Sequence, residues 1–251
     1  MSVLQAIILG VVEGLTEFLP VSSTAHLMIF SKLLGVGDSE FLKTFEISIQ
    51  LGAIFAVLFL YFKKIFSDFS LIKNIIAGFL PTGVVGFLFY GVFKSLLGRA
   101  DIALAALFLG GVVLILFERI RRGEEKNQLL NLKKSFVIGL WQTLAMIPGV
   151  SRSMATILGG TVGGLSKKSA IEFSFLLALP TMFSATIYDL YRNHSLLNFS
   201  QWQILLIGFV VAFLSALVSV KFFLKFIEKN SFSSFGWYRI VFATAVLLIL
   251  F

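Results

Sequence analysis

Long apolar segments follow one another along this chain and constrain its fold more than any other feature. Most contain 15 to 25 residues, and a helix of about 20 apolar residues crosses the hydrocarbon core of a bilayer. With 58% of its 251 residues hydrophobic, the chain has more apolar side chain than a soluble core buries. We therefore expect an all-α integral membrane protein, because a barrel would show short alternating strands. The segments are 3–19, 21–35, 41–62, 71–97, 102–122, 134–147, 150–164, 168–191, 201–228 and 236–251.

The ten segments divide into two sets of five. In each set the first two are short and meet at a proline, Pro20 or Pro148, which ends one helix and starts the next. We expect each short pair to form a re-entrant helical hairpin, followed by three transmembrane helices. This gives six spans and two re-entrant hairpins in a single membrane domain, 1–251. Its parts are a first repeat, 1–122, a cytoplasmic linker, 123–133, and a second repeat, 134–251.

The two sets are related in sequence. Leu19–Thr24 (LPVSST) resembles Ile147–Ser153 (IPGVSRS) with one inserted glycine. A hairpin makes no net crossing and three spans make an odd number, so the two halves have opposite orientations. This pattern is typical of an inverted-topology repeat. The alternative is a chance similarity between short apolar sequences.

Basic residues indicate the orientation. Most of the 21 Lys and Arg residues stand at segment ends, and the positive-inside rule then places linker 123–133 in the cytoplasm and both termini outside. Arg239 is assigned to the cytoplasmic side in the same way. Because these charges form no single basic face, we expect no nucleic-acid partner despite the net charge of +8. The absence of cysteine excludes disulfides, thiolate metal sites and cysteine nucleophiles.

Two carboxylates lie within the first apolar segment. Glu13 and Glu17 are four residues apart and share one helix face. A charge at the bilayer centre costs about 2.5–3.5 kcal/mol on insertion scales, so such residues usually face a cavity and mark function. Paired carboxylates also suit Mg²⁺ or Ca²⁺, although the sequence does not decide whether a metal is required. We expect no organic cofactor. The alternative is a structural pair at the membrane surface.

Hydroxyl groups follow the first proline. Ser22, Ser23, Thr24 and His26 lie at a predicted helix start, where hydroxyls cap and backbone N–H groups attract anions such as phosphate. Serines in this position are often caps only. His26 favours a functional site because an imidazole can transfer protons near neutral pH.

The second hairpin carries a cation. Arg152 lies in an otherwise uncharged segment with Ser151, Ser153 and Thr156, and it needs an anionic partner. That partner is either Glu13 or Glu17, or an anionic substrate, since a guanidinium binds phosphate in a forked geometry. We expect the two hairpin tips to meet near the middle of the membrane. Gln50, one helical turn after Glu46, either supports the site or forms a structural pair between helices.

The two motifs resemble the signatures of a known family. Glu13–His26 (EGLTEFLPVSSTAH) and Pro148–Thr156 (PGVSRSMAT) are similar to those of the bacterial undecaprenyl-pyrophosphate phosphatases, also called bacitracin-resistance proteins. The resemblance covers essentially the whole chain. It implies hydrolysis of undecaprenyl diphosphate to undecaprenyl phosphate and inorganic phosphate, which recycles the lipid carrier for peptidoglycan synthesis and confers bacitracin resistance. It also implies a multi-pass protein of the bacterial plasma (inner) membrane, with the active site facing the periplasm.

The resemblance also implies residue roles. The expected catalytic residues are Glu13, Glu17, Ser23, His26 and Arg152. The expected substrate-binding residues are Ser22, Thr24, Ser151, Ser153, Thr156 and Gln50. The expected partners are undecaprenyl diphosphate and membrane lipid, and a homodimer is compatible with the sequence.

Two mechanisms and two functions remain open at this stage. Either Ser23 attacks the terminal phosphorus while His26 and a carboxylate handle its proton, or His26 or Glu17 positions an attacking water. Inverted repeats with broken helices are also typical of secondary transporters, so a transporter or flippase for a lipid phosphate is the alternative function. A scaffold protein would not need ionisable residues in both hairpins.

Overall fold

The computed structural model describes residues 1–96, 99–121, 128–193 and 198–250, and these residues form helices and no strand. Part of the predicted linker 123–133 lies outside the described residues. The elements are α1 (Val3–Thr16), α2 (Ser23–Leu33), α3 (Glu40–Ser67), α4 (Phe69–Leu88), α5 (Tyr90–Leu96), α6 (Ala100–Ile120), α7 (Leu132–Thr143), the 3₁₀ turn η1 (Leu144–Met146), α8 (Arg152–Val162), α9 (Lys167–Asn193), α10 (Phe199–Ile227) and α11 (Ser233–Leu250).

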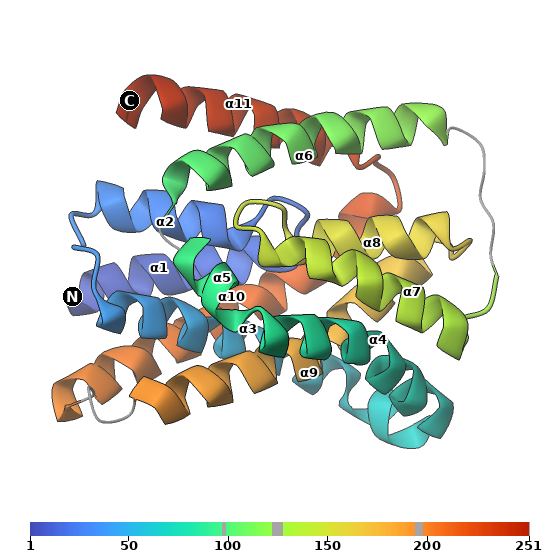
Figure 1. Ribbon diagram of the computed structural model, residues 1–251, viewed down its shortest axis with the longest axis horizontal. Helices are drawn as coiled ribbons and strands as arrows, with labels where there is room; N and C mark the ends of the chain where they lie inside the picture. The colour runs from blue at the N-terminus through green and yellow to red at the C-terminus, as the bar shows by residue number, and fades with distance from the viewer. Residues whose placement is uncertain (97–98, 122–127, 194–197, 251) are drawn as a thin grey trace.

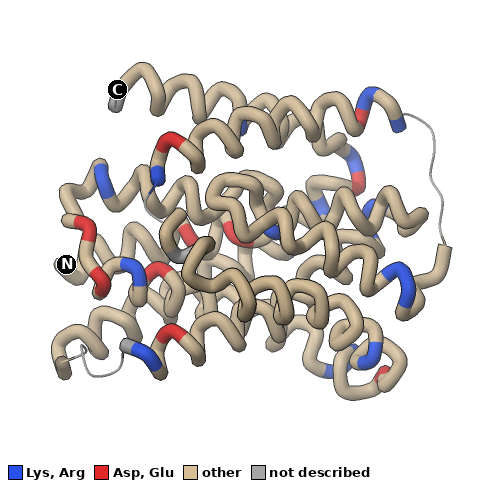
Figure 2. The backbone as a smooth tube through the Cα atoms, in the orientation of Figure 1, with Lys and Arg blue, Asp and Glu red and all other residues tan. Residues whose placement is uncertain are grey.

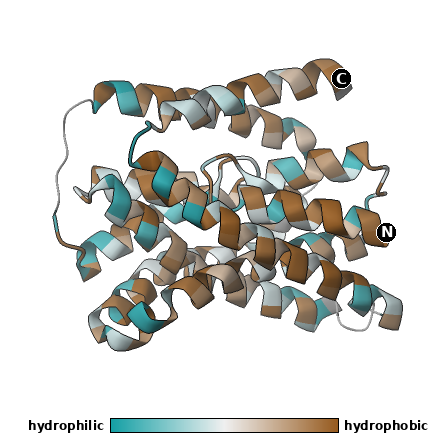
Figure 3. Ribbon diagram, turned by 180° about the vertical axis from the view of Figure 1, so that it is seen from behind, coloured by the Kyte–Doolittle hydropathy of each residue, from teal (hydrophilic) through white to brown (hydrophobic). Residues whose placement is uncertain are grey.

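The helices have the length and composition of a multi-pass membrane protein. Among the described residues, five helices are long and apolar enough to cross a bilayer, namely α3, α4, α6, α9 and α10. Helix α11, at the sixth predicted span, is apolar but shorter. Large apolar side chains cover the outer surface, where Phe87 and Leu248 are almost fully exposed, and Figure 3 shows hydrophobic residues along most helices. Lipid is the solvent that suits such a surface.

Two predicted segments are subdivided. Segment 71–97 forms α4 and α5 instead of one span, because the backbone of Phe89 leaves helical values between them (φ −111°, ψ 20°). Segment 134–147 is helical only to Thr143 and tightens into η1 before the proline. Both breaks fall within apolar sequence, so hydropathy alone does not reveal them.

The short helix pairs approach the centre of the molecule from opposite ends. In Figure 1, α1 runs inward from the end that carries the N-terminus and α2 returns to it, while α7 and α8 do the same from the other end. Around them, α1 packs along α10, α7 along α4, α3 along α9, and α6 along α11. The turns at residues 17–22 and 147–151 therefore lie near the centre of the molecule, between the two ends of the long helices that surround them.

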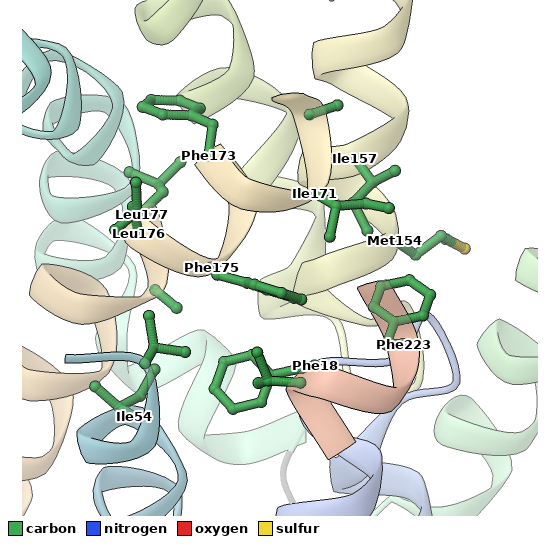
Figure 4. Close-up of a cluster of buried hydrophobic side chains, with 14 of the residues drawn as sticks. Phe18, Ile54, Met154, Ile157, Ile171, Phe173, Phe175, Leu176, Leu177 and Phe223 are labelled. Atoms are coloured by element: carbon green, nitrogen blue, oxygen red, sulfur yellow. The ribbon is translucent and has the colours of Figure 1, made fainter. Parts of the chain in front are cut away.

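A large apolar cluster surrounds these turns. Phe18, from the first turn, packs edge-on against Phe175 of α9, with ring centroids 5.1 Å apart. Phe223 of α10 and Met154 of α8 belong to the same cluster (Figure 4). Most charged residues lie toward helix ends, and few lie at the centre (Figure 2). The polar residues of the two turns are thus packed among large buried apolar side chains.

Candidate active site

Each hairpin turns on a serine in an unusual backbone conformation. Ser22 and Ser151 have φ values of 68° and 77° and are the non-glycine residues with positive φ in the described chain. Such a conformation costs on the order of 1–2 kcal/mol for an L-residue, so the surrounding packing must hold it. Each serine directly precedes a helix, α2 or α8. The two turns therefore bring two helix N-termini to the centre of the molecule.

Glu17 joins the two hairpins. Arg152 Nη2 donates to Glu17 Oε1 at 2.8 Å, and the Ser23 hydroxyl donates to Glu17 Oε2 in a short hydrogen bond. The side chains of Glu17 and Arg152 are almost fully buried. Arg152 Nη1 also donates to the backbone oxygen of Ser174 at 2.8 Å, whereas its Nε is buried without a partner. The structure thus brings together three of the five predicted catalytic residues.

Glu13 lies next to this ion pair and differs from Glu17 in its contacts. It is completely buried, and neither carboxylate oxygen has a hydrogen-bond partner in the described structure. It stands on α1, one helical turn before Glu17. A buried carboxylate without a donor is costly, so this group is suited to a bound cation or to a shared proton.

The carboxylates of Glu13 and Glu17 can be compared with the ligands that a bound metal ion requires. The described residues hold no group of three His, Asp or Glu side chains that could bind a metal. Mg²⁺, however, is usually held by one or two carboxylates together with substrate phosphate oxygens. Glu13 offers two oxygens for this purpose, whereas both oxygens of Glu17 are already engaged. The free carboxylate oxygens of Glu13 therefore fit a cation that the substrate helps to bind.

His26 is oriented away from Ser23. Its Nδ1 lies 2.8 Å from the backbone oxygen of Ser22, and its Nε2 lies 2.8 Å from the hydroxyl of Tyr238. Both ring nitrogens therefore have partners other than the Ser23 hydroxyl. The Ser23 hydroxyl donates to Glu17 in this arrangement, so Glu17 is placed to accept its proton, and the part of the predicted mechanism given to His26 stays a prediction.

The second hairpin tip contributes three hydroxyls, of which that of Ser153 connects the two halves. Ser153 donates to the backbone oxygen of Leu19 at 2.7 Å. Ser151 accepts from the amide of Met154 and caps α8. Thr156 lies 2.6 Å from the hydroxyl of Ser174, and thereby supports the contact of Ser174 with Arg152. Ser151, Ser153 and Thr156 belong to the predicted cluster, whereas Ser174 does not.

Two predicted substrate-binding residues are not joined to the cluster. Thr24 and Gln50 are half-buried, and no hydrogen bond among the described side chains connects either of them to Glu17 or Arg152. Ser22 is buried, but its side chain makes no capping hydrogen bond. It contributes its carbonyl oxygen instead, which holds His26.

Arg239 is the main correction to the predicted topology. It is fully buried on α11, not at the cytoplasmic surface, and donates hydrogen bonds to five backbone oxygens. These belong to Pro20, Gly149, Val150, Ala106 and Leu107. Gly110 of α6 leaves room for it, since a Cβ at that position would overlap the guanidinium. The bilayer does not exclude this charge because protein carbonyls solvate it completely.

A family model connects this site to known proteins. The model described as "Bacitracin resistance protein BacA" matches residues 6–245. This chain belongs to the BacA family. The family predicted from the two motifs is thereby confirmed.

Relatives of this BacA-family chain carry one name. A protein of Sulfurihydrogenibium sp. (strain YO3AOP1) is 53% identical over 96% of both chains. A protein of Wolinella succinogenes is 51% identical over 96% of this chain and 95% of its own, and one of Aquifex aeolicus is 48% identical over 94% of both. All three are named undecaprenyl-diphosphatase.

Three residues of the BacA-family site were not predicted to take part in it. Ser174 binds Arg152, Tyr238 binds His26, and Arg239 contacts both turns. Only Arg239 has a signal in the sequence. It is an arginine within an apolar segment, the same criterion that singled out Arg152.

Proposed function

We propose that this chain is an undecaprenyl-diphosphatase, an enzyme that hydrolyses undecaprenyl diphosphate to undecaprenyl phosphate and inorganic phosphate. This reaction recycles the lipid carrier of peptidoglycan synthesis and confers bacitracin resistance. Membership of the BacA family and the names of the relatives support the assignment. The structural observation that supports a phosphatase reaction is the buried Arg152–Glu17–Ser23 arrangement, which places a cation, a proton acceptor and a hydroxyl together.

Ser23 is the proposed nucleophile. Its oxygen attacks the terminal phosphorus, the bond from that phosphorus to the bridging oxygen breaks, and the lipid monophosphate leaves. Glu17, which already accepts the Ser23 hydrogen bond, takes the proton. A water molecule then attacks the same phosphorus, the bond from Ser23 to phosphorus breaks, the serine oxygen takes back the proton held by Glu17, and inorganic phosphate leaves with both hydrogens of the water. Splitting one hard step into two easier ones is the usual advantage of a covalent intermediate.

Arg152 is the proposed electrostatic group. Two of its nitrogens are held by Glu17 and Ser174, while Nε has no partner. Phosphoryl transfer develops negative charge on the phosphate oxygens, and a preoriented guanidinium in a dry site stabilises that charge strongly. Arg152 binds Glu17 in the described arrangement, so we expect substrate to share or replace that contact.

A divalent cation remains part of the proposal. Glu13, with help from the substrate, is the residue that would hold Mg²⁺ or Ca²⁺, and such an ion neutralises phosphate charge when bound. The residues of this chain otherwise supply the nucleophile, the proton acceptor and the oriented cation.

The inverted repeat is supported by the packing of the helices. Under the proposed relation, α1 corresponds to α7 and α10 corresponds to α4. The relation therefore converts the packed pair α1–α10 into the pair α7–α4, which is also packed in the structure. The pairs α3–α9 and α6–α11 each join corresponding helices of the two halves. Ser22 and Ser151 share their positive φ. We therefore propose repeats at 1–122 and 134–251, each with a re-entrant hairpin and three spans.

The proposed location is the bacterial inner membrane. Linker 123–133 then lies in the cytoplasm, and the substrate reaches the site from the periplasmic side, with its lipid tail among the helices. The basic residues at helix ends support this orientation through the positive-inside rule. A homodimer stays a prediction.

Phosphate release by purified protein in detergent tests the function, because transport has no meaning without a membrane. The probes are farnesyl diphosphate and undecaprenyl diphosphate, with and without Mg²⁺ or Ca²⁺. We expect release from the wild-type protein, whereas a transporter or flippase would release none. Absence of phosphate at every pH and metal level would remove the phosphatase proposal.

The nucleophile is tested separately. We expect Ser23→Ala to lower turnover on the order of 10³-fold or more, and acid-quenched wild-type protein to carry phosphate on Ser23. Ser31→Ala is the matched control, because Ser31 is a buried serine of the same helix that bonds its own helix backbone. If Ser23→Ala retains most of the turnover, water is the nucleophile.

A further inference from the structure

Tyr238 is the unexpected partner of His26. Its hydroxyl lies 2.8 Å from His26 Nε2, although the two residues are on α2 and α11, at opposite ends of the sequence. The rings are nearly parallel, with centroids 5.7 Å apart, and Phe242 stacks on the same imidazole at 4.3 Å. Aromatic neighbours on one helix thus fix both the plane of the ring and one of its nitrogens.

The hydrogen bonds determine which nitrogen carries the proton. The backbone oxygen of Ser22 can only accept, so Nδ1 of His26 must donate to it. In a neutral imidazole the other nitrogen then presents a lone pair. The Tyr238 hydroxyl can donate to that lone pair. A hydroxyl and a carbonyl on opposite sides of the ring therefore favour a single tautomer, with the proton on Nδ1 and a basic Nε2.

Tyr238 is also placed at the boundary of the site. His26 is buried, whereas Tyr238 is 44% exposed and lines a surface cavity along α11 with Trp237 and Val241. Tyr238 therefore stands between the buried imidazole and the surface of the helix bundle. Replacing it with hydrogen leaves the ring stack intact and creates little buried space.

We propose that Tyr238 is a positioning residue of the phosphatase reaction, which acts by holding His26 in the tautomer whose Nε2 is free of a proton. The proposal rests on the proposed function and on the part in turnover that the family resemblance gives to His26. Nε2 is then the basic atom of His26, the Tyr238 hydroxyl is the group through which a proton reaches it, and the stack of Tyr238 and Phe242 keeps its direction constant.

The tautomer can be measured without any assay of activity. The chain contains two histidines, so protein with ¹⁵N-labelled histidine shows the nitrogens of two imidazoles, and His194→Gln assigns them. We expect His26 to show a protonated Nδ1 and an unprotonated, hydrogen-bonded Nε2. In Tyr238→Phe we expect the Nε2 signal to shift toward that of an unbonded nitrogen. Identical His26 signals in wild type and Tyr238→Phe would overturn the proposal.

Kinetics provide the second readout. Loss of one hydrogen bond worth about 0.5–1.5 kcal/mol predicts that Tyr238→Phe lowers kcat by about 2- to 12-fold, with KM nearly unchanged because the substrate contacts remain. Trp237→Phe is the control, since Trp237 is an exposed neighbour on α11, and we expect wild-type kinetics. A wild-type kcat in Tyr238→Phe, or a change in KM alone, would refute the positioning role.

The two readouts separate the two proposals. If wild-type protein releases no phosphate, the proposed function fails, but the histidine signals still decide whether Tyr238 selects the tautomer. Comparable thermal unfolding of wild type, Tyr238→Phe and Trp237→Phe shows that the kinetic comparison concerns folded protein. An unfolded Tyr238→Phe variant would itself contradict the expectation of an intact ring stack.

Discussion

The two hairpin tips have similar backbones but different chemistry. Ser22 and Ser151 both have positive φ values, 68° and 77°, immediately before a helix. The next residue is Ser23 in one tip and Arg152 in the other, and each donates to a different oxygen of Glu17. Equivalent positions thus supply a hydroxyl and a cation to one carboxylate. The site therefore depends on the few positions at which the two similar hairpins carry different side chains.

The tips also differ in how they use the serine with positive φ. Ser151 caps its helix with its hydroxyl, which accepts from Met154 N. Ser22 makes no such cap and uses its carbonyl to hold His26 instead. The second tip therefore has the more stable helix start, and the first tip has the oriented imidazole.

Replacing Arg152, the cation of the second tip, should have the largest effect on stability and activity. Arg152→Ala leaves Glu17 buried without its ion-pair partner, which costs about 3–5 kcal/mol of stability, and removes phosphate stabilisation worth about 10²- to 10³-fold in kcat. Phosphate release and thermal unfolding in detergent measure the two losses.

Arg152→Lys separates charge from geometry in the same position. A lysine keeps the charge but lacks the planar fork, so we expect activity between those of wild type and Arg152→Ala. Turnover of Arg152→Ala within tenfold of wild type would show that the cation of the second tip is not used in catalysis.

The residue that contacts both tips should have the next largest effect. Arg239→Met removes five hydrogen bonds from a charged donor but also removes a buried charge, and these contributions partly cancel. We expect a net loss of about 2 kcal/mol, which corresponds to a fall in Tm of about 4–8 °C for a chain of this size.

Lys221→Met is the control for the loss of a positive charge. Lys221 is exposed on α10, so its replacement should leave the Tm nearly unchanged. An Arg239→Met variant as stable as wild type would show that the tips hold together without the guanidinium.

The smallest effect concerns the two serines themselves. Ser151→Ala removes a helix cap worth about 1 kcal/mol, whereas Ser22→Ala removes no cap and should cost less than about half of that. Thermal unfolding of both variants in detergent measures the difference between their losses of stability. Equal shifts would mean that the tips are energetically equivalent and differ only in chemistry.

Much of this architecture is readable from the sequence. Apolar length predicts the membrane class, and the prolines at 20 and 148 predict where the short helices break. Spacing places Glu13 and Glu17 on one face, and the isolated Arg152 predicts an anionic partner, which is Glu17. These properties are local, or follow from the cost of an unpaired charge in an apolar medium.

Other features depend on contacts between distant segments. Tyr238 reaches His26 across 212 positions of sequence, and no periodicity encodes such a pairing. Arg239 resembles a topology signal because a charge near a helix end is usually exposed. The break at Phe89 lies within continuous apolar sequence. Whether Gln50 serves the substrate stays a prediction, since its half-buried position on α3 shows no bond to the cluster.

The contacts of Arg239 have a consequence for biosynthesis. A chain emerges from the ribosome from its N-terminus, so Pro20 and the first hairpin are made long before Arg239, which binds that hairpin and the second one. Until α11 enters the membrane and docks on α6, the carbonyls of both turns lack this donor. The hydrogen bonds from Arg239 to the two turns therefore form only at the end of insertion, when every predicted catalytic residue is already in the chain.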